Sequence, residues 1–234
     1  QPLRVWVPGC ATGEEVYSLA MALLDFLADR PMAPQIKLFG TDISESALER
    51  ARAGRYGRGI ESDVSAARLQ RYFVTCEGGY QVSAALRDLC MFARHDITSD
   101  PPFSNVDLLS CRNVLIYLGS NLQRRVMPIF HFALTANGFL LLGEAETPGL
   151  MQDLFEQVDG RQKIYQRRPV PPRPLAVFPP GTARTGGKQL PYTLTYGDGA
   201  AMDLQRETDR LVLARYAPPS VVVDDRYDIV LLDC

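Results

Sequence analysis

The stretch VWVPGCATGEEVYS, residues Val5–Ser18, combines a strand, a glycine turn and the beginning of a helix. Its apolar first part stops at Pro8 and Gly9, and Gly13 precedes a helical spacing of apolar residues that continues to Ala28. Such a turn brings backbone N–H groups and the positive end of a helix close to a ligand. Glycines in such turns also serve plain packing between helix and strand, so the turn alone leaves both interpretations open.

A second apolar strand, Ile36–Thr41, runs into Asp42. In a Rossmann-like sheet, a carboxylate at the tip of the second strand accepts hydrogen bonds from a nucleoside ribose. The alternative is that Asp42 caps the helix that begins at Ser44. Together with the glycine turn, the acidic strand tip favours a nucleoside site.

Three motifs, in this order, resemble those of the CheR-type chemotaxis protein methyltransferases. They are RVWVPGCATGEEVYSLA (Arg4–Ala20), FGTDISESALERAR (Phe39–Arg52) and CRNVLIYL (Cys111–Leu118). The resemblance covers Leu3–Arg168 and implies methylation of receptor glutamates with S-adenosylmethionine (SAM), leaving S-adenosylhomocysteine (SAH). It also implies a cytoplasmic enzyme that acts on a chemoreceptor or related signalling protein. The run DLFEQVDGRQKIYQRR (Asp153–Arg168) is most similar to hybrid members that continue into PAS modules.

The resemblance implies an α/β chain with the Rossmann-like fold of class I methyltransferases. The catalytic domain is expected over residues 1–168, without the family's N-terminal helical domain and with a small inserted β-subdomain at about 73–94. A linker rich in proline and glycine is expected at 169–199, and an amphipathic helix at 200–217. Residues 218–234 resemble the opening of a PAS domain, a candidate partner module in the same chain.

The other elements follow from periodicity and turn signals. A helix over Ser120–Ala136 is expected to end at Asn137 and Gly138, and Arg55–Ile60 is expected as loop. The strands expected late in the chain are Val106–Ser110, Phe139–Leu142, Leu154–Val158, Lys163–Arg167, Ser220–Val223 and Tyr227–Leu232. The last four are expected to form two hairpins, and a reversed final strand in the first of them is usual in class I methyltransferases, by resemblance.

Composition narrows the function classes. The 234 residues carry a net charge of −2, which argues against nucleic acid or an anionic membrane as partner. No apolar run reaches the roughly 18 residues of a membrane span, so no membrane insertion is expected. The five cysteines are scattered, without a CxxC pair or a histidine cluster, so neither zinc nor a disulfide framework is indicated. The chain is expected in a reducing cytoplasm.

Methyl transfer to glutamate needs positioning more than a base. The acceptor carboxylate is already ionised at pH 7, because its unperturbed pKa is about 4.3. The resemblance implies that Gly9 and Gly13 pass under the methionine portion of SAM and that Glu15 attracts its ammonium group. Asp42 would hold the ribose hydroxyls. For Glu15 the alternative is a first-turn glutamate that complements the helix dipole.

The resemblance assigns the remaining roles to two later segments. Asp96 and Ile97 would border the adenine, although the family usually has Asn-Leu at these positions. Arg112 and Asn113 follow a buried strand, where ligands bind in open α/β sheets, and Arg112 is also a candidate catalytic residue. Tyr117 matches the family tyrosine near the transferred methyl group, and its alternative is a core aromatic.

Two other functions remain open at this stage. One is a regulatory module that binds SAM or SAH without efficient turnover. The other is a nicotinamide dehydrogenase, which is disfavoured because the first turn lacks a third glycine at the Rossmann spacing.

Overall fold

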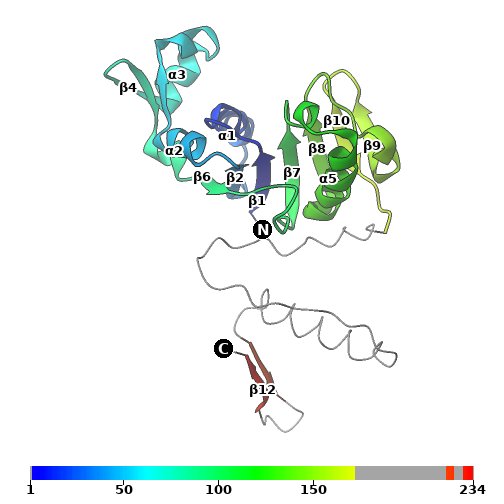
Figure 1. The fold of residues 1–234 in the computed structure, drawn as a ribbon. Helices are drawn as coiled ribbons and strands as arrows, with labels where there is room; N and C mark the ends of the chain where they lie inside the picture. Colours follow the sequence, from blue (N-terminus) through cyan, green and yellow to red (C-terminus); the bar gives the residue numbers. More distant parts are fainter. Residues whose placement is uncertain (1, 172–219, 224–228, 234) are drawn as a thin grey trace, which may run out of the picture. The chain divides into compact units, whose positions relative to one another are not determined.

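A computed structural model describes residues 2–171, 220–223 and 229–233 of the chain (Figure 1). The chain divides into two units, residues 1–183 and 184–234. The first unit holds a mixed seven-stranded sheet with helices packed on it. Across the sheet its strands are β6 (Cys90–Arg94), β2 (Ile36–Asp42), β1 (Leu3–Pro8), β7 (Val106–Cys111), β8 (Leu134–Leu142), β10 (Ile164–Arg167) and β9 (Phe155–Asp159).

The first five strands of that order run parallel, and β10 is antiparallel to both of its neighbours. This is the Rossmann-like sheet expected for class I methyltransferases, and the expected reversed last strand is confirmed. The helices of the unit are α1 (Glu14–Leu27), α2 (Glu45–Ala53), α3 (Ala66–Tyr72), α4 (Ala84–Arg87) and α5 (Ser120–Ala133), with short 3-10 helices η1 (Arg58–Ser62), η2 (Leu115–Tyr117) and η3 (Gly149–Leu154).

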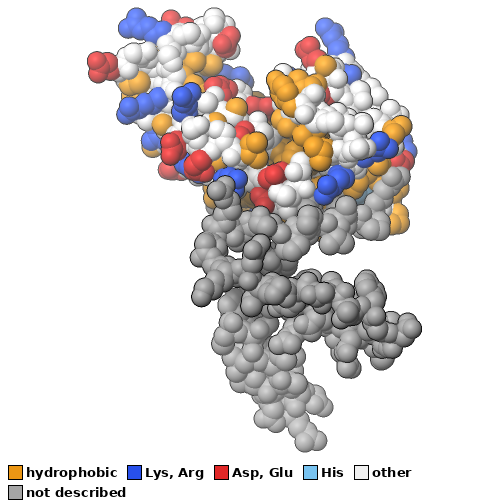
Figure 2. Space-filling view, viewed as in Figure 1, with side chains coloured by type: hydrophobic (Ala, Val, Ile, Leu, Met, Phe, Trp, Pro, Cys, Tyr) orange, Lys and Arg blue, Asp and Glu red, His pale blue; other side chains and the backbone are white. Residues whose placement is uncertain are grey.

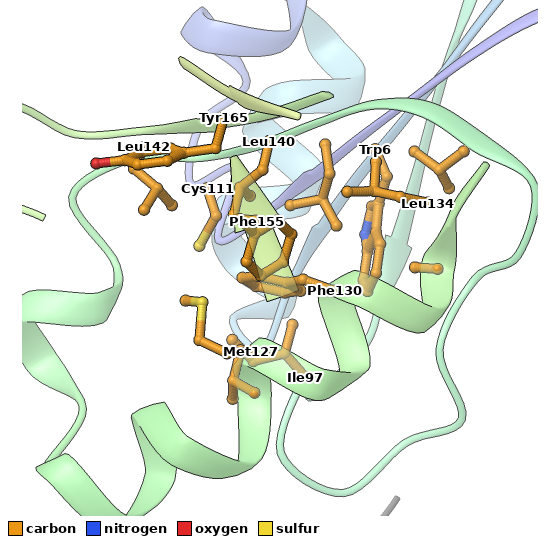
Figure 3. Packing of buried hydrophobic residues seen from close by; sticks show 14 of the residues in the cluster. Trp6, Ile97, Cys111, Met127, Phe130, Leu134, Leu140, Leu142, Phe155 and Tyr165 are labelled. Carbon is orange, nitrogen blue, oxygen red and sulfur yellow. The ribbon is translucent and has the colours of Figure 1, made fainter. Parts of the chain in front are cut away.

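Alternation along β1 explains why the two faces of the sheet carry different helices. Val5 and Val7 pack with residues of α1, whereas Trp6 between them packs with Phe130 of α5. Trp6 is fully buried in the apolar core between the sheet and α5 (Figure 3). Its indole nitrogen donates a hydrogen bond to Thr41 Oγ1 at 2.9 Å. The single tryptophan of the chain therefore packs its apolar ring in the core and has a hydrogen-bond partner for its N–H group there.

A second, small sheet has the order β3 (Arg55–Gly57), β5 (Gly79–Val82) and β4 (Phe73–Cys76). The hairpin expected around Gly78 is confirmed, but the predicted bounds of the subdomain, 73–94, are wrong. Arg55–Gly57, predicted as loop, pairs with β5, and Cys90–Arg94 belongs to the main sheet. A three-residue strand that ends in glycine is too short to show alternation in the sequence.

The boundary between α5 and β8 also differs from the prediction. The helix ends at Ala133 instead of Ala136, and β8 begins at Leu134. Asn137 and Gly138 therefore lie inside a strand, where the pairing between β7 and β8 shifts register. The turn preference of Asn137 and Gly138 therefore coincides with irregular strand pairing and not with the end of a helix.

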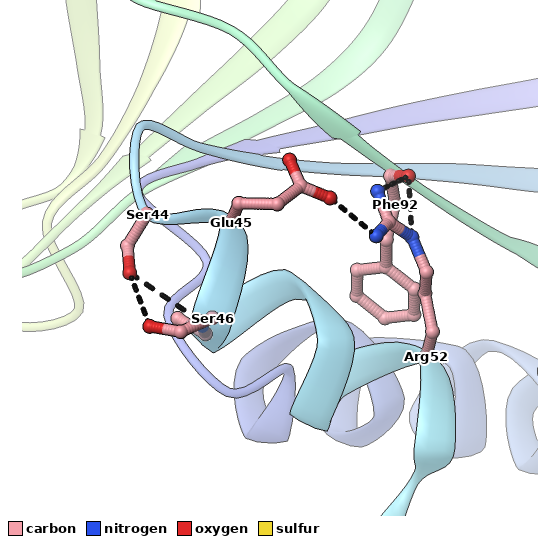
Figure 4. Close-up of polar contacts among 6 residues, drawn as sticks. Ser44, Glu45, Ser46, Arg52 and Phe92 are labelled. Atoms are coloured by element: carbon pink, nitrogen blue, oxygen red, sulfur yellow. Dashed lines mark hydrogen bonds and ion pairs between the residues drawn. The ribbon is translucent and has the colours of Figure 1, made fainter.

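The free edge of β6 is covered by an arginine from α2 (Figure 4). Arg52 donates from Nε and Nη2 to the Phe92 carbonyl at 3.3 and 3.1 Å, and its Nη1 pairs with Glu45 at 2.7 Å. Ser44 caps the same helix, as expected, by accepting a hydrogen bond from the Ala47 N–H. Helix α2 is thus fixed at its start and joined to the sheet edge at its end.

In the second unit the described residues form one antiparallel pair, β11 (Ser220–Val223) and β12 (Ile229–Asp233). The two strands expected there are confirmed as an antiparallel pair, and the described part of the second is Ile229–Asp233. The helix expected at 200–217 and nearly all of the linker expected at 169–199 lie outside the described residues, and the PAS resemblance stays a prediction. Among the described residues no helix has the length and hydropathy for a membrane span.

Gly13 generates a stability prediction. Its φ is +92°, and an added Cβ would lie 2.9 Å from the Ala51 Cβ. We expect Gly13→Ala to lower the free energy of unfolding by about 1–3 kcal/mol, because it combines backbone strain with a steric clash. Gly59→Ala is the matched control, since nothing lies within 4 Å of its added Cβ. Urea denaturation measures both, and equal values for the two variants would contradict the packing role of Gly13.

Candidate functional site

A cleft of about 700 Å³ opens at the carboxyl ends of β1, β2, β6 and β7. Figure 2 shows the surface hollowed between the part that carries α3 and β4 and the part that carries β8 and α5. Strand order reverses between β1 and β7, and ligands of open α/β sheets bind at such a switch point. The predicted site residues that line the cleft are Gly9, Glu15, Asp42, Asp96, Ile97, Arg112, Asn113 and Tyr117.

Gly13 is the exception among the predicted residues, because it does not line the cleft. Its packing against Ala51 of α2 accounts for it, and this supports the packing interpretation of the second glycine. Gly9 differs, since an added Cβ there would collide with the side chain of Val114 on the opposite wall of the cleft. Its φ of +69° is a second reason for glycine.

The side chain of Asp42 holds the glycine turn by accepting hydrogen bonds from backbone N–H groups. Its Oδ2 accepts from the Ala11 N–H at 2.9 Å, and its Oδ1 accepts from the Ser44 N–H at 2.9 Å. The capping alternative does not describe Asp42, because the Ser44 hydroxyl makes the cap. Each carboxylate oxygen has two acceptor positions, so Asp42 retains capacity for a pair of hydroxyls.

Glu15 joins α1 to the central strand. Its Oε1 accepts a hydrogen bond from the hydroxyl of Ser110, a fully buried residue of β7. Burial raises the pKa of Glu15, while the Ser110 hydroxyl and the charge of Arg112 oppose that rise. Ionising the Glu15 side chain on the cleft wall therefore costs more free energy than ionising an exposed glutamate.

The β6 end of the cleft is formed by a tight turn. Asp96 Oδ1 accepts from the N–H and the hydroxyl of Thr98 at 2.8 and 2.7 Å. Burial alone would raise the pKa of Asp96, but hydrogen bonds from Thr98 and Ser99 and the charge of His95 together outweigh it, and the pKa is lowered. Ile97 is buried in the same cluster as Trp6, so it presents an apolar edge between a charged acceptor and the core.

The opposite wall is the turn that follows β7. Arg112 and Asn113 are exposed, and Asn113 has a left-handed backbone with φ +58°. Tyr117 is 82% exposed at the end of η2, so the core-aromatic alternative for this residue is wrong. The side chains of Tyr117 and Arg112 are therefore exposed to solvent on this wall of the cleft.

Two further residues that support the cleft escaped the sequence reasoning. Tyr56 of the small sheet donates from its hydroxyl to the Thr12 carbonyl at 2.9 Å and so holds the glycine turn from outside. Glu146, 4% exposed, accepts hydrogen bonds from the turn after β7. The signal for Glu146 was its place just beyond a predicted parallel strand, the same criterion that selected Asp42 and Arg112.

The described residues contain no group of three or more His, Cys, Asp or Glu side chains that could hold a metal ion. Cys10 lines the cleft as a free thiol, and burial followed by the nearby Asp42 charge raises its pKa to about 12. The polar side chains that line the cleft are carboxylates, the Cys10 thiol, the His95 imidazole, the Thr98 hydroxyl, the Arg112 guanidinium, the Asn113 amide and the Tyr117 phenol. This set suits a polar organic ligand.

A family model described as "CheR methyltransferase, SAM binding domain" matches residues 1–164. Over 231 residues the chain is 35% identical to an uncharacterised 104.1 kDa protein of Rhodobacter capsulatus, covering 97% of this chain and 24% of that protein. It is 35% identical over 175 residues to the putative methyltransferase Cher3 of Pseudomonas putida, covering 70% and 63% of the two chains. It is 34% identical over 176 residues to chemotaxis protein methyltransferase 1 of Pseudomonas aeruginosa, covering 71% and 63%.

Among solved structures, a TehB-like SAM-dependent methyltransferase from Corynebacterium glutamicum matches with a TM-score of 0.41 and 14% identity. That match covers 70% of this chain and 78% of the other. The chain spans less than two thirds of the length of each of the three curated relatives above.

The position of Asp42 generates a binding prediction. We expect Asp42→Ala to raise the dissociation constant of SAH at least about tenfold, because charged hydrogen bonds contribute roughly 1.5–3 kcal/mol each. Isothermal titration calorimetry measures the constant, and circular dichroism checks the fold. Glu77→Ala, an exposed carboxylate in the turn between β4 and β5, is the control and should stay within about twofold. An unchanged constant in folded Asp42→Ala protein would remove the ribose assignment.

Proposed function

Because the chain belongs to the CheR methyltransferase family, we propose that it methylates glutamate side chains of a chemoreceptor or related signalling protein. The cofactor of this domain is SAM, as the family description states. Several relatives are named chemotaxis protein methyltransferases, and these names support the acceptor class. The observation that carries the proposal is the convergence of carboxylates and one guanidinium on a single cleft at the switch point of the sheet.

The size of the cleft and the order of the polar groups along it support this cofactor placement. A volume of about 700 Å³ lies in the range typical of ligand sites, roughly 300–1,000 Å³. Along the strand ends, Asp96 and Ile97 would receive the adenine, Asp42 the ribose, and Glu15 beside Gly9 the amino-acid end. When bound, SAM supplies a methyl group on a positively charged sulfur.

The acceptor would approach over the β7 wall. Arg112 attracts the incoming carboxylate, and the exposed Tyr117 hydroxyl donates a hydrogen bond that orients one of its oxygens toward the cleft. No residue needs to remove a proton, because a glutamate carboxylate is ionised at neutral pH. The contribution of the chain is alignment and exclusion of water, and misplacement of reacting atoms by about 1 Å costs on the order of a hundredfold in rate.

A methyl-transfer assay on the full-length protein tests the proposal. Incubation with methyl-labelled SAM and a cytoplasmic receptor fragment should give base-labile label on the fragment, since a carboxyl methyl ester hydrolyses to methanol in alkali. A fragment whose glutamates are replaced by alanine should remain unlabelled. We expect Tyr117→Phe to lower kcat at least about tenfold, the factor that 1.4 kcal/mol represents, with SAH affinity unchanged.

Three other outcomes would contradict the proposal. Binding of SAH without label transfer by the full-length protein would indicate a regulatory module. Binding of NAD in place of SAH would indicate a dehydrogenase. Label that survives alkali would indicate another acceptor group.

The raised pKa of Glu15 gives a pH prediction. Ionised Glu15 attracts the ammonium group of SAH, so its contribution is present at neutral pH and lost as pH falls through the raised pKa. We expect SAH affinity to decline on acidification before a glutamate with the ordinary pKa of about 4.3 would protonate. Glu15→Gln should show lower affinity at pH 7.5 and a flatter acid limb, measured by titration calorimetry from pH 5 to 8. Glu49→Gln, exposed on α2, is the control, and an acid limb unchanged in Glu15→Gln would exclude Glu15 as its source.

A further inference from the structure

Glu146 lies behind the cleft, between the chain segments that follow β7 and β8. It is not among the residues that line the cleft, and it is 4% exposed. Such burial of a carboxylate is costly unless hydrogen bonds replace its water. The side chain is therefore held in place by the groups around it, and these belong to the turn that carries the β7 wall.

Four backbone N–H groups donate to this one carboxylate. Oε2 accepts from Asn113 at 3.0 Å and from Gly143 at 2.8 Å. Oε1 accepts from Leu115 at 2.8 Å and from Ile116 at 3.3 Å. The last two donors begin η2, whose own N-cap residue makes no side-chain cap. Glu146 thus does for a short helix what a capping side chain does locally, but from the loop that follows β8.

The turn that Glu146 holds is the turn that forms the cleft wall. Asn113, Val114, Tyr117 and Leu118 all line the cleft. Asn113 keeps a left-handed backbone, and such a conformation persists where surrounding contacts determine it. Val114 reaches across to Gly9, so the position of the turn sets the spacing between the two walls.

We propose that Glu146 is a positioning residue of the SAM site, whose carboxylate fixes the Asn113–Tyr117 turn at the spacing that the cofactor needs. Glu146 touches neither cofactor nor acceptor; it acts through the backbone of the turn. The inference rests on the proposed placement of the cofactor in this cleft.

Glu146→Gln in the full-length protein is the first test. The amide keeps one acceptor oxygen but turns an NH₂ group toward backbone donors, so half of the acceptor capacity is lost. We expect amide hydrogen exchange to accelerate at least tenfold in peptides covering 112–118, with exchange in β1 and α5 unchanged. The SAH dissociation constant should rise at least tenfold, while the emission of buried Trp6 stays that of the wild type. The matched control, Glu156→Gln on β9, is exposed and should change neither quantity.

Gly143→Ala is the second test, because it leaves every carboxylate in place. Its added Cβ would lie 2.7 Å from Glu146 Oε2 and 2.8 Å from Asn113 Oδ1, and its φ is not positive, so the change is steric. We expect the same local pattern of exchange and a smaller rise in the SAH dissociation constant, of about threefold.

The outcomes separate this inference from the placement of the cofactor. If wild-type protein and Asp42→Ala bind SAH equally, the placement fails. If Asp42→Ala binds weakly but folded Glu146→Gln binds as the wild type does, the positioning role is overturned. Faster exchange throughout the protein with unchanged SAH affinity indicates a purely structural contact and overturns it too, as does failure of both Glu146→Gln and Gly143→Ala to fold.

Discussion

Hydrogen bonds from backbone N–H groups to carboxylates hold the loops at the carboxyl ends of the parallel strands. A strand that ends in a tight turn leaves amide donors without partners, and each of them must be satisfied. Asp42 serves the first turn, Asp96 the turn after β6, and Glu146 the turn after β7. Asp42 and Asp96 also line the cleft, so part of its negative charge comes from groups that hold its loops, and this charge suits a cationic cofactor.

The sheet can place these loops because it is fixed from both faces. Trp6 ties β1 to α5 on one side, and Val5 and Val7 tie it to α1 on the other. Since β1 also pairs with both β2 and β7, the two walls of the cleft share one strand as reference. Close-packed protein interiors have low compressibility and transmit strain, so the core resists small displacements of one wall.

Local patterns predicted most main-sheet strands, the start of α2 and the acidic tip of β2, whereas most other cleft residues were assigned by the family resemblance. Asp42 and Arg112 were found because each follows an apolar strand, and that criterion is visible in the sequence. Glu146 also follows an apolar strand, but its role was missed because three of its four backbone donors lie 30 to 33 residues away along the chain. The end of α5 was misplaced because the local preference of Asn137 and Gly138 for turns predicted the end of a helix there. Pairing with β7 instead makes this segment part of a strand. Contacts between neighbouring strands decide both cases.

The arginine on the edge of β6 bears on how copies of this protein behave toward one another. An uncovered edge strand offers its carbonyls to any extended chain, which is the usual route to ordered aggregation. Here the Phe92 carbonyl is already occupied by the Arg52 guanidinium, and a second copy that paired at this position would have to displace a charged donor. A guanidinium keeps its proton at every pH at which the protein is handled, so acid or mild alkali leaves this barrier intact. Its link to Glu45, by contrast, is an exposed ion pair that salt screens, which makes high ionic strength the condition under which the edge loses part of its support.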